Sequence, residues 1–261
     1  MNNDKNIKLI LAMETTGRVA SVSLAHREGA RIRQKRYVAE AGYNHLTCLM
    51  PMIQQALSAE GRRPGDLDAI AVSAGPGSFT GIRIGISAAR AMAQALQIPL
   101  IPVPTLETFV YNDDEPNRVC IPVFDARRNQ IYAGAYTIVR KEPESTRHTA
   151  VVKTIVKGGA YDPVDFMGLL EEALTVEEKR RTRFFGDGFP IYEACFRKGT
   201  ASLSVAPEPL SFQTASSVAC WAFAQGIAVD YQTVEPIYMR KAEAQRKLDE
   251  SREEMRKKAF G

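Results

Sequence analysis

The 261-residue sequence has few of the residues that bind metals or form disulfides. It contains three histidines and four cysteines, and neither a Cys-x-x-Cys nor a His-x-x-x-His pair. The cysteines are widely separated, at Cys48, Cys120, Cys195 and Cys220. Such spacing is typical of free thiols in a reducing compartment. We therefore expect a cytoplasmic protein without a metal site of its own.

Long hydrophobic runs are also missing. Residues 1–8 are polar apart from Met1 and Ile7, and the following apolar run is broken by Lys8 and ended by Glu14. No secretory leader and no membrane span fits this pattern. We expect no association with a membrane.

Net charge is small and unevenly distributed. The chain carries 34 basic and 30 acidic residues, a net charge of +4. Residues 240–258 hold 8 basic and 5 acidic residues, which leaves 26 basic and 25 acidic, or +1, elsewhere. A nearly neutral body does not favour nucleic-acid binding by itself. Residues 239–261 are expected to form a charged tail.

An acidic residue follows a buried strand twice, 111 residues apart. A strand at 7–13 leads to Glu14, a polar turn and a strand at 19–25, and a strand from 121 leads to Asp125, a turn and a strand at 131–139. Two such hairpins in register indicate an internal duplication. Acids at these places hold magnesium in phosphoryl-transfer folds, but they also accept hydrogen bonds within their own turns. The spacing leaves both interpretations open.

Residues 44–57 predict a helix with two apolar rows. One row is Leu46, Leu49, Met50, Ile53 and Leu57, and the other is Cys48, Met52 and Ala56. A helix with two apolar rows either lies deep inside a fold or offers one row to a partner protein.

Residues 73–85 form a turn with four glycines and a proline, between an apolar run at 69–72 and a helix that ends near residue 96. Such a turn either presents N–H groups to an anion or allows another backbone to approach closely. It matches neither a Walker loop nor Gly-x-Gly-x-x-Gly. In the helix, Gly81, Gly85 and Ala89 form a ridge with little side chain, and Arg83 and Arg90 belong to a polar stripe.

Two other chemistries are weakly supported. Ser78 does not stand in Gly-x-Ser-x-Gly, because residue 80 is Thr, and it is better interpreted as the N-cap of the next helix. His45 and Cys48 could share a helical face, but no nearby residue completes a metal site. Both are expected to be structural.

Six motifs, in order along nearly the whole chain, closely resemble those of the bacterial TsaB family. They are the stretches at 10–16, 45–53, 73–85, 104–107, 124–127 and 236–240, which read ILAMETT, HLTCLMPMI, SAGPGSFTGIRIG, PTLE, FDAR and PIYMR. The resemblance implies an α/β, two-lobed, actin-like or sugar-kinase-like ATPase (ASKHA) fold with mixed sheets flanked by helices. The lobes would be 1–104 and 105–238, followed by the tail.

The resemblance also implies a function. Members of this family are non-catalytic scaffold subunits that pair with the paralogue TsaD, and with the ATPase TsaE, to form threonylcarbamoyladenosine (t6A) at position 37 of tRNAs that read ANN codons. TsaD carries the metal through a His-x-x-x-His motif that this chain lacks. We therefore expect no tightly bound cofactor here, ATP and metal on the partner subunits, contact with tRNA only through the complex, and a possible homodimer.

The resemblance places the partner interface on the helices at 44–57 and 81–96. The residues expected there are His45, Leu46, Leu49, Met50, Met52, Ile53, Thr80, Gly81, Arg83, Ile84, Gly85, Ile86 and Arg90. The glycine turn would then serve close packing. A vestigial nucleotide site would comprise Glu14, Thr15, Asp125, Gly186 and Gly188. Glu14 stands where the family usually has Asp, which weakens a nucleotide or magnesium role.

Two alternatives belong to other functional classes. One is a stand-alone ATPase or small-molecule kinase that binds a nucleotide between Glu14, Asp125 and residues 186–188. The other is a peptidase, against which the lack of a catalytic triad and of a metal pair argues.

Overall fold

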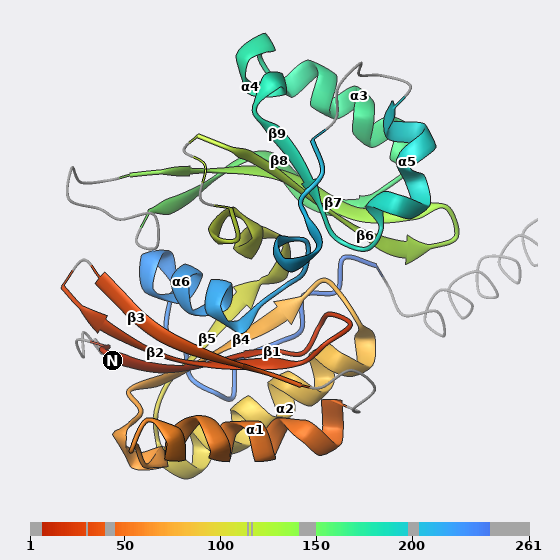
Figure 1. Ribbon diagram of the computed structural model, residues 1–261. Helices are drawn as coiled ribbons and strands as arrows, with labels where there is room; N and C mark the ends of the chain where they lie inside the picture. Colours follow the sequence, from red (N-terminus) through yellow and green to blue (C-terminus); the bar gives the residue numbers. More distant parts are fainter. Residues whose placement is uncertain are drawn as a thin grey trace, which may run out of the picture.

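The structure is a computed structural model that describes residues 7–29, 31–39, 45–113, 115, 117–140, 150–197 and 204–240. Two sheets lie roughly one above the other, with helices between them and on both outer faces (Figure 1). Most of the predicted tail, residues 241–261, falls outside the described residues.

The first sheet has five strands in the order β3-β2-β1-β4-β5. They are β1 (Leu9–Glu14), β2 (Ser21–Glu28), β3 (Arg31–Val38), β4 (Ala69–Gly75) and β5 (Leu100–Pro104). β1 runs antiparallel to β2 and parallel to β4, and Met13 is paired with Val72. β1 and β4 are buried on both faces, which explains their nearly continuous apolar sequences.

The second sheet repeats this arrangement, with the order β8-β7-β6-β9. Its strands are β6 (Val119–Arg127), β7 (Gln130–Val139), β8 (Val151–Tyr161) and β9 (Thr182–Phe185). β6 is antiparallel to β7 and parallel to β9, as β1 is to β2 and β4. The duplication predicted from the two hairpins is therefore confirmed.

Helices fill three layers around the sheets (Figure 1). Helices α1 (His45–Ala59) and α2 (Phe79–Leu96) cover the outer face of the first sheet. α3 (Pro163–Ala173), α4 (Val176–Arg180) and α5 (Phe189–Arg197) lie on the outer side of the second. Between the sheets lie α6 (Ala215–Gln225) and the 3₁₀ helix η2 (Thr105–Tyr111). Two short 3₁₀ turns are η1 (Pro64–Asp66) and η4 (Glu208–Leu210).

The layer between the sheets is one continuous apolar core. Ile10 and Ala12 of β1 point into it, whereas Leu9, Leu11 and Met13 point to α1 and α2. Fully buried Phe109 of η2 lies 5.6 Å from the ring of Phe124 and 5.7 Å from that of Phe185. Helix α6 belongs by sequence to the second half of the chain, but it packs on both sheets.

Within the described ranges, no helix combines the length and apolar character needed to cross a bilayer.

Candidate functional site

The glycine turn holds the start of α2 against the end of β1. The backbone N–H of Ser78 donates to the Thr16 carbonyl at 2.8 Å, and the Thr15 hydroxyl donates to the Gly81 carbonyl at 2.7 Å. A Cβ added to Gly81 would overlap the carbonyl oxygen of Thr15. A Cβ added to Gly77 would lie 2.7 Å from the carbonyl oxygen of Thr16. The Ser78 hydroxyl caps α2 by accepting from the Gly81 N–H at 3.2 Å. The close-packing interpretation of this turn and the N-cap role of Ser78 are both confirmed.

Glu14 is completely buried and its carboxylate is used inside the chain. It accepts hydrogen bonds from the Ser73 hydroxyl, from the Thr16 hydroxyl at 2.6 Å and from the Thr16 N–H at 2.5 Å. Burial raises the pKa of Glu14, and these hydrogen bonds oppose that shift. Because Glu14 and Thr15 are both buried, the sequence-based placement of their side chains in an open nucleotide site is corrected. The donor set does not fit a magnesium ligand at this position.

A cleft of about 630 Å³, here called the Asp125 cleft, opens between the two halves of the chain. Its lining comprises Thr16, Gly17, Arg18, His45, Gly77, Ser78, Phe79, Thr80, Phe124, Asp125, Ala126, Arg127, Tyr132, Asp187 and Gln213. Asp125 is exposed and accepts from the Arg127 N–H at 2.8 Å and from the Tyr192 hydroxyl at 3.1 Å. The cleft thus receives side chains from the ends of both duplicated hairpins.

Gly186 and Gly188 pack against the backbone of β6 next to this cleft. A Cβ on Gly188 would lie 2.6 Å from the carbonyl carbon of Phe124, and one on Gly186 would overlap the Val123 carbonyl oxygen. The residue between them, Asp187, lines the cleft. Burial raises the pKa of Asp187, and the charge of Arg18 lowers it. The sequence-based site named the two glycines but not Asp187, which entered only within the range 186–188 of the kinase alternative.

The predicted partner interface divides into an exposed and a buried part. Leu46 is 66% exposed and Met50 51% exposed on α1, and Thr80 and Arg83 are exposed on α2. Ile84 is half-buried, as is His45, whose Nε2 lies 3.1 Å from the Gly17 carbonyl oxygen.

The other predicted interface positions lie inside the protein. Leu49, Met52, Ile53, Gly81, Gly85 and Ile86 are all buried, and the four apolar side chains belong to the core beneath the first sheet. The small-residue ridge of α2 faces Thr15 of the same chain. These six placements are corrected, because the first sheet covers Leu49, Met52 and Ile53 of α1 and Ile86 of α2, and Thr15 covers the glycines of the α2 ridge.

Arginines of α2 bind the last described segment of the chain. Arg90 donates to the carbonyls of Tyr231 and Gln232 at 2.8 and 2.6 Å, so its guanidinium is not offered to a partner. Arg83 donates to the Tyr238 hydroxyl at 3.2 Å and lies 3.9 Å from the centre of the Phe79 ring. Phe79 and Tyr238, both 43% exposed with ring centres 5.2 Å apart, were missed from the sequence. An aromatic residue among polar neighbours at 78–80 was the available signal for Phe79.

Among the residues that the structure describes, no three His, Cys, Asp or Glu side chains are grouped to hold a metal ion. The His45 ring contacts a backbone carbonyl, and the Cys48 thiol donates to the His45 carbonyl at 3.7 Å. The structural interpretation of both residues agrees with these contacts.

Comparison with known proteins gives consistent matches. The family model described as "TsaD: tRNA N6-adenosine threonylcarbamoyltransferase" matches residues 37–247. The tRNA threonylcarbamoyladenosine biosynthesis protein TsaB of Escherichia coli is 28% identical over 92% of this chain and 97% of its own length. The Bacillus subtilis protein of the same name is 38% identical over 49% of this chain, and the chain spans 54% of that relative.

Solved structures match over most of the chain. YeaZ from Pseudomonas aeruginosa superposes with a TM-score of 0.66 and 24% identity, covering 89% of this chain and all of that one. A further Pseudomonas aeruginosa protein, described as similar to the peptidase YEAZ, gives 0.69 and 23% over 90% of this chain and all of that one. These likenesses confirm the expected two-lobed, actin-like fold. The family model covers well over half of the chain, so the chain belongs to the TsaD family of tRNA N6-adenosine threonylcarbamoyltransferases and resembles the proteins named TsaB.

Proposed function

We propose that this chain is a non-catalytic scaffold subunit in the formation of t6A at position 37 of tRNAs that read ANN codons. It works in the cytoplasm by pairing with TsaD, and TsaE joins the pair. The relatives that match it over more than 90% of its length are named as t6A biosynthesis proteins, which supports the pathway. In this proposal ATP and the metal bind the partner subunits, and tRNA contacts this chain through the complex. No observation favours the stand-alone kinase alternative.

The observation that carries the pairing is an exposed apolar surface at the N-terminal ends of α1 and α2. It comprises Leu46, Met50 and Phe79, with the Tyr238 ring tilted against that of Phe79. Exposed apolar and aromatic side chains gathered at one place are typical of protein interfaces. We name these four residues the apolar helix-end surface. The same surface would serve a homodimer, in which it would meet its own copy.

Glu14 supports a scaffold role over a nucleotide-binding one. Both of its carboxylate oxygens accept hydrogen bonds from hydroxyl groups of the same chain, so neither is presented to the Asp125 cleft. In the proposed complex the first hairpin therefore maintains the shape of the helix ends and does not hold a phosphate.

The pairing is tested by mixing the purified chain with TsaD from the same bacterium and measuring the mass of the product by light scattering after gel filtration. The wild-type chain is expected to form a heterodimer. Met50→Glu places a charge in the apolar helix-end surface. It is expected to weaken that heterodimer at least tenfold, because burying an unpaired charge at the centre of an interface is costly.

Val176→Glu is the matched control. Val176 is 70% exposed on α4, on the outer side of the second sheet, so a charge there should leave both fold and pairing unchanged. Equal pairing by Met50→Glu and wild type would contradict the proposed interface. Threonylcarbamoyl transfer by the isolated chain would contradict the non-catalytic role.

A further inference from the structure

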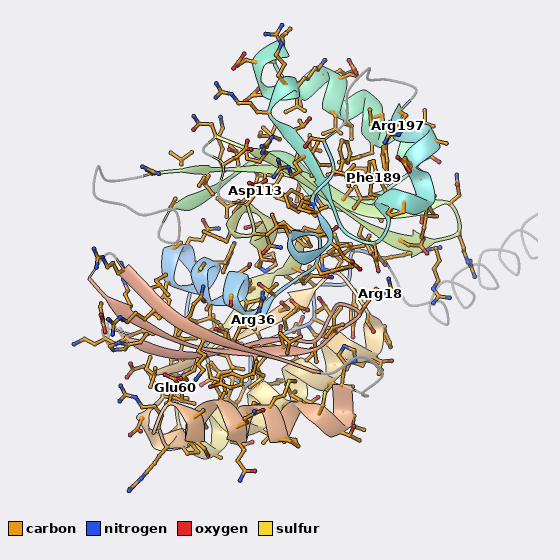
Figure 2. All side chains as sticks on the ribbon, viewed as in Figure 1. Arg18, Arg36, Glu60, Asp113, Phe189 and Arg197 are labelled. Carbon is orange, nitrogen blue, oxygen red and sulfur yellow. The ribbon has the colours of Figure 1, made fainter. Side chains whose placement is uncertain are left out.

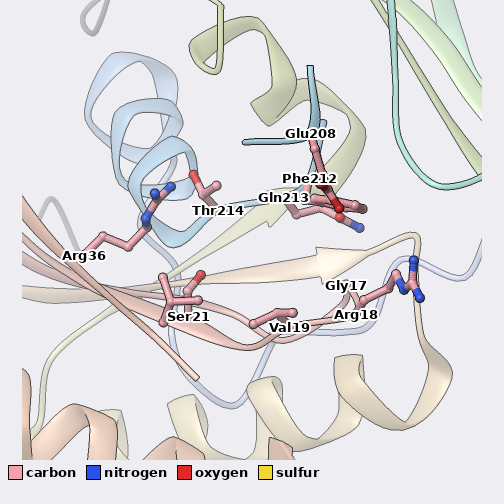
Figure 3. Close-up of a pocket in the computed structure, with 10 residues that line it drawn as sticks. Gly17, Arg18, Val19, Ser21, Arg36, Glu208, Phe212, Gln213 and Thr214 are labelled. Atoms are coloured by element: carbon pink, nitrogen blue, oxygen red, sulfur yellow. The ribbon is translucent and has the colours of Figure 1, made fainter. Parts of the chain in front are cut away.

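A second hollow lies between β2, β3 and the segment that leads into α6 (Figure 3). It measures about 630 Å³, within the usual range for small-molecule sites. The lining comprises Gly17, Arg18, Val19, Ser21, Arg36, Val38, Glu208, Phe212, Gln213 and Thr214. We call it the arginine pocket. Gln213 lies against Gly17, at the boundary with the Asp125 cleft, and a Cβ on Gly17 would come within 2.9 Å of its Oε1.

Both walls of the arginine pocket are held in place by hydrogen bonds. Asn112 donates to the Phe212 carbonyl at 2.8 Å and to the Leu210 carbonyl at 2.9 Å. The Ala215 N–H donates to the Ser21 hydroxyl at 3.0 Å, which ties the start of α6 to β2. Ser21 is itself paired with Val38 of β3. The pocket is therefore formed before any ligand enters, which lowers the entropic cost of binding.

Positive charge borders the pocket at two places. Arg36 of β3 is exposed, and its guanidinium has no hydrogen bond or ion pair to another described residue. Arg18, at the end near the Asp125 cleft, is exposed as well and acts electrostatically on Asp187. Figure 2 shows both on the side of the first sheet that faces the second. Glu208 is the one carboxylate of the lining, so the lining carries a net charge of +1.

Apolar side chains lie between these charges. Val19 is 41% exposed and Val38 53% exposed, and the half-buried ring of Phe212 lies across the pocket from Val19 in Figure 3. A ligand that covers these groups would gain from removing apolar surface from water. A guanidinium group recognises phosphate and carboxylate through paired N–H donors.

We propose that the arginine pocket binds a small organic anion: an aromatic or bulky apolar group lies against Val19, Val38 and Phe212, and a phosphate or carboxylate is bound by Arg36 with help from Arg18. The site is distinct from the Asp125 cleft, where the two acidic side chains offset the charges of Arg18 and Arg127 and leave no net positive charge for such an anion. The proposal goes beyond the scaffold function and does not depend on it.

Titration calorimetry of the full-length chain with four probes tests the proposal. Phenyl phosphate and benzoate carry both a ring and an anion, whereas inorganic phosphate has only the charge and benzyl alcohol only the ring. We expect one of the first two to bind at least about tenfold more tightly than either of the last two, because charge and ring contribute together. Comparison of phenyl phosphate with benzoate identifies the anionic group.

Three variants locate the binding. Arg36→Gln should weaken it about tenfold by removing one charge-assisted contact. Arg33→Gln is the matched control, since Arg33 is exposed on the same strand but its side chain points to the opposite face of the sheet. Glu208→Gln should tighten binding, because it removes the carboxylate that repels the anion.

All three positions are at the surface, so the variants should remain folded, and thermal unfolding checks this. The proposal is overturned if neither ring-bearing anion binds at millimolar concentration. It is also overturned if Arg33→Gln weakens binding as much as Arg36→Gln, because attraction would then come from the general charge of the strand.

Discussion

The substitution Gly81→Ala tests whether the small-residue ridge of α2 serves packing within the chain. The carbonyl group of Thr15 occupies the space that a Cβ on Gly81 would need. Thr15 is fixed by β1 and by its own hydrogen bond to the Gly81 carbonyl, so backbone rather than a flexible side chain would have to move. Overpacking of this kind costs about 1–3 kcal/mol, and a clash with backbone belongs at the upper end.

The loss is offset in part by the better helix propensity of alanine, which contributes about 1 kcal/mol. We therefore expect a net destabilisation of about 2 kcal/mol and a melting temperature lower by roughly 4–8 °C for a chain of this size. Circular dichroism at the helix signal, during heating and during urea titration, measures both quantities.

Gly168→Ala is the internal control. Gly168 lies within α3, and a Cβ there meets nothing within 4 Å. Its replacement should raise stability by roughly 0.5–1 kcal/mol through helix propensity alone. If Gly81→Ala were as stable as Gly168→Ala but no longer paired with TsaD, the ridge would belong to a partner interface, as the sequence first indicated, and our assignment of it to internal packing would be refuted.

Two more predictions concern buried charge. Burial raises the pKa of Glu14 above the ordinary value of 4.5, so the contribution of Glu14 to stability is greatest below that pH and is lost as the pH rises through the folded pKa. The side chain in Glu14→Gln cannot ionise. Urea midpoints should therefore show the stability of the variant rising relative to wild type as the pH increases from 4.5 towards neutrality. A stability difference between the two proteins that does not change with pH would contradict this. Asp113, 2% exposed, binds Arg183 at 2.6 Å and Arg118 at 3.4 Å, and Asp113→Ala should cost about 3–5 kcal/mol in urea unfolding by leaving buried Arg118 and partly buried Arg183 without that partner. A loss below about 1 kcal/mol would mean that the remaining contacts of these arginines suffice.

The duplicated hairpins could be predicted because strands buried on one or both faces leave a local signature of apolar runs and turns. Strand β3 could not be predicted, because four of its eight residues are basic. It lies at the edge of the sheet, where charged side chains can extend into solvent. Helix α5 was also missed, because it is short and contains a proline near its start.

The site was predicted less completely because its contacts join distant parts of the chain. Glu14 lies beside Ser73, 59 residues later, only because Met13 of β1 is paired with Val72 of β4. The spacing in α1 correctly predicted two apolar rows, but spacing alone does not say which residues the sheet covers. Leu46 and Met50 are exposed to solvent, whereas Leu49 and Ile53 are buried beneath the sheet.

The position of α6 between the sheets has a consequence for how the chain is made. The inner face of the first sheet, complete in sequence by Pro104, has part of its cover in a helix that ends only at Gln225. During synthesis the ribosome must extend the chain by about another hundred and twenty residues before that covering helix can dock. A nascent chain halted before α6 would display bare apolar strands, a natural target for chaperones and proteases.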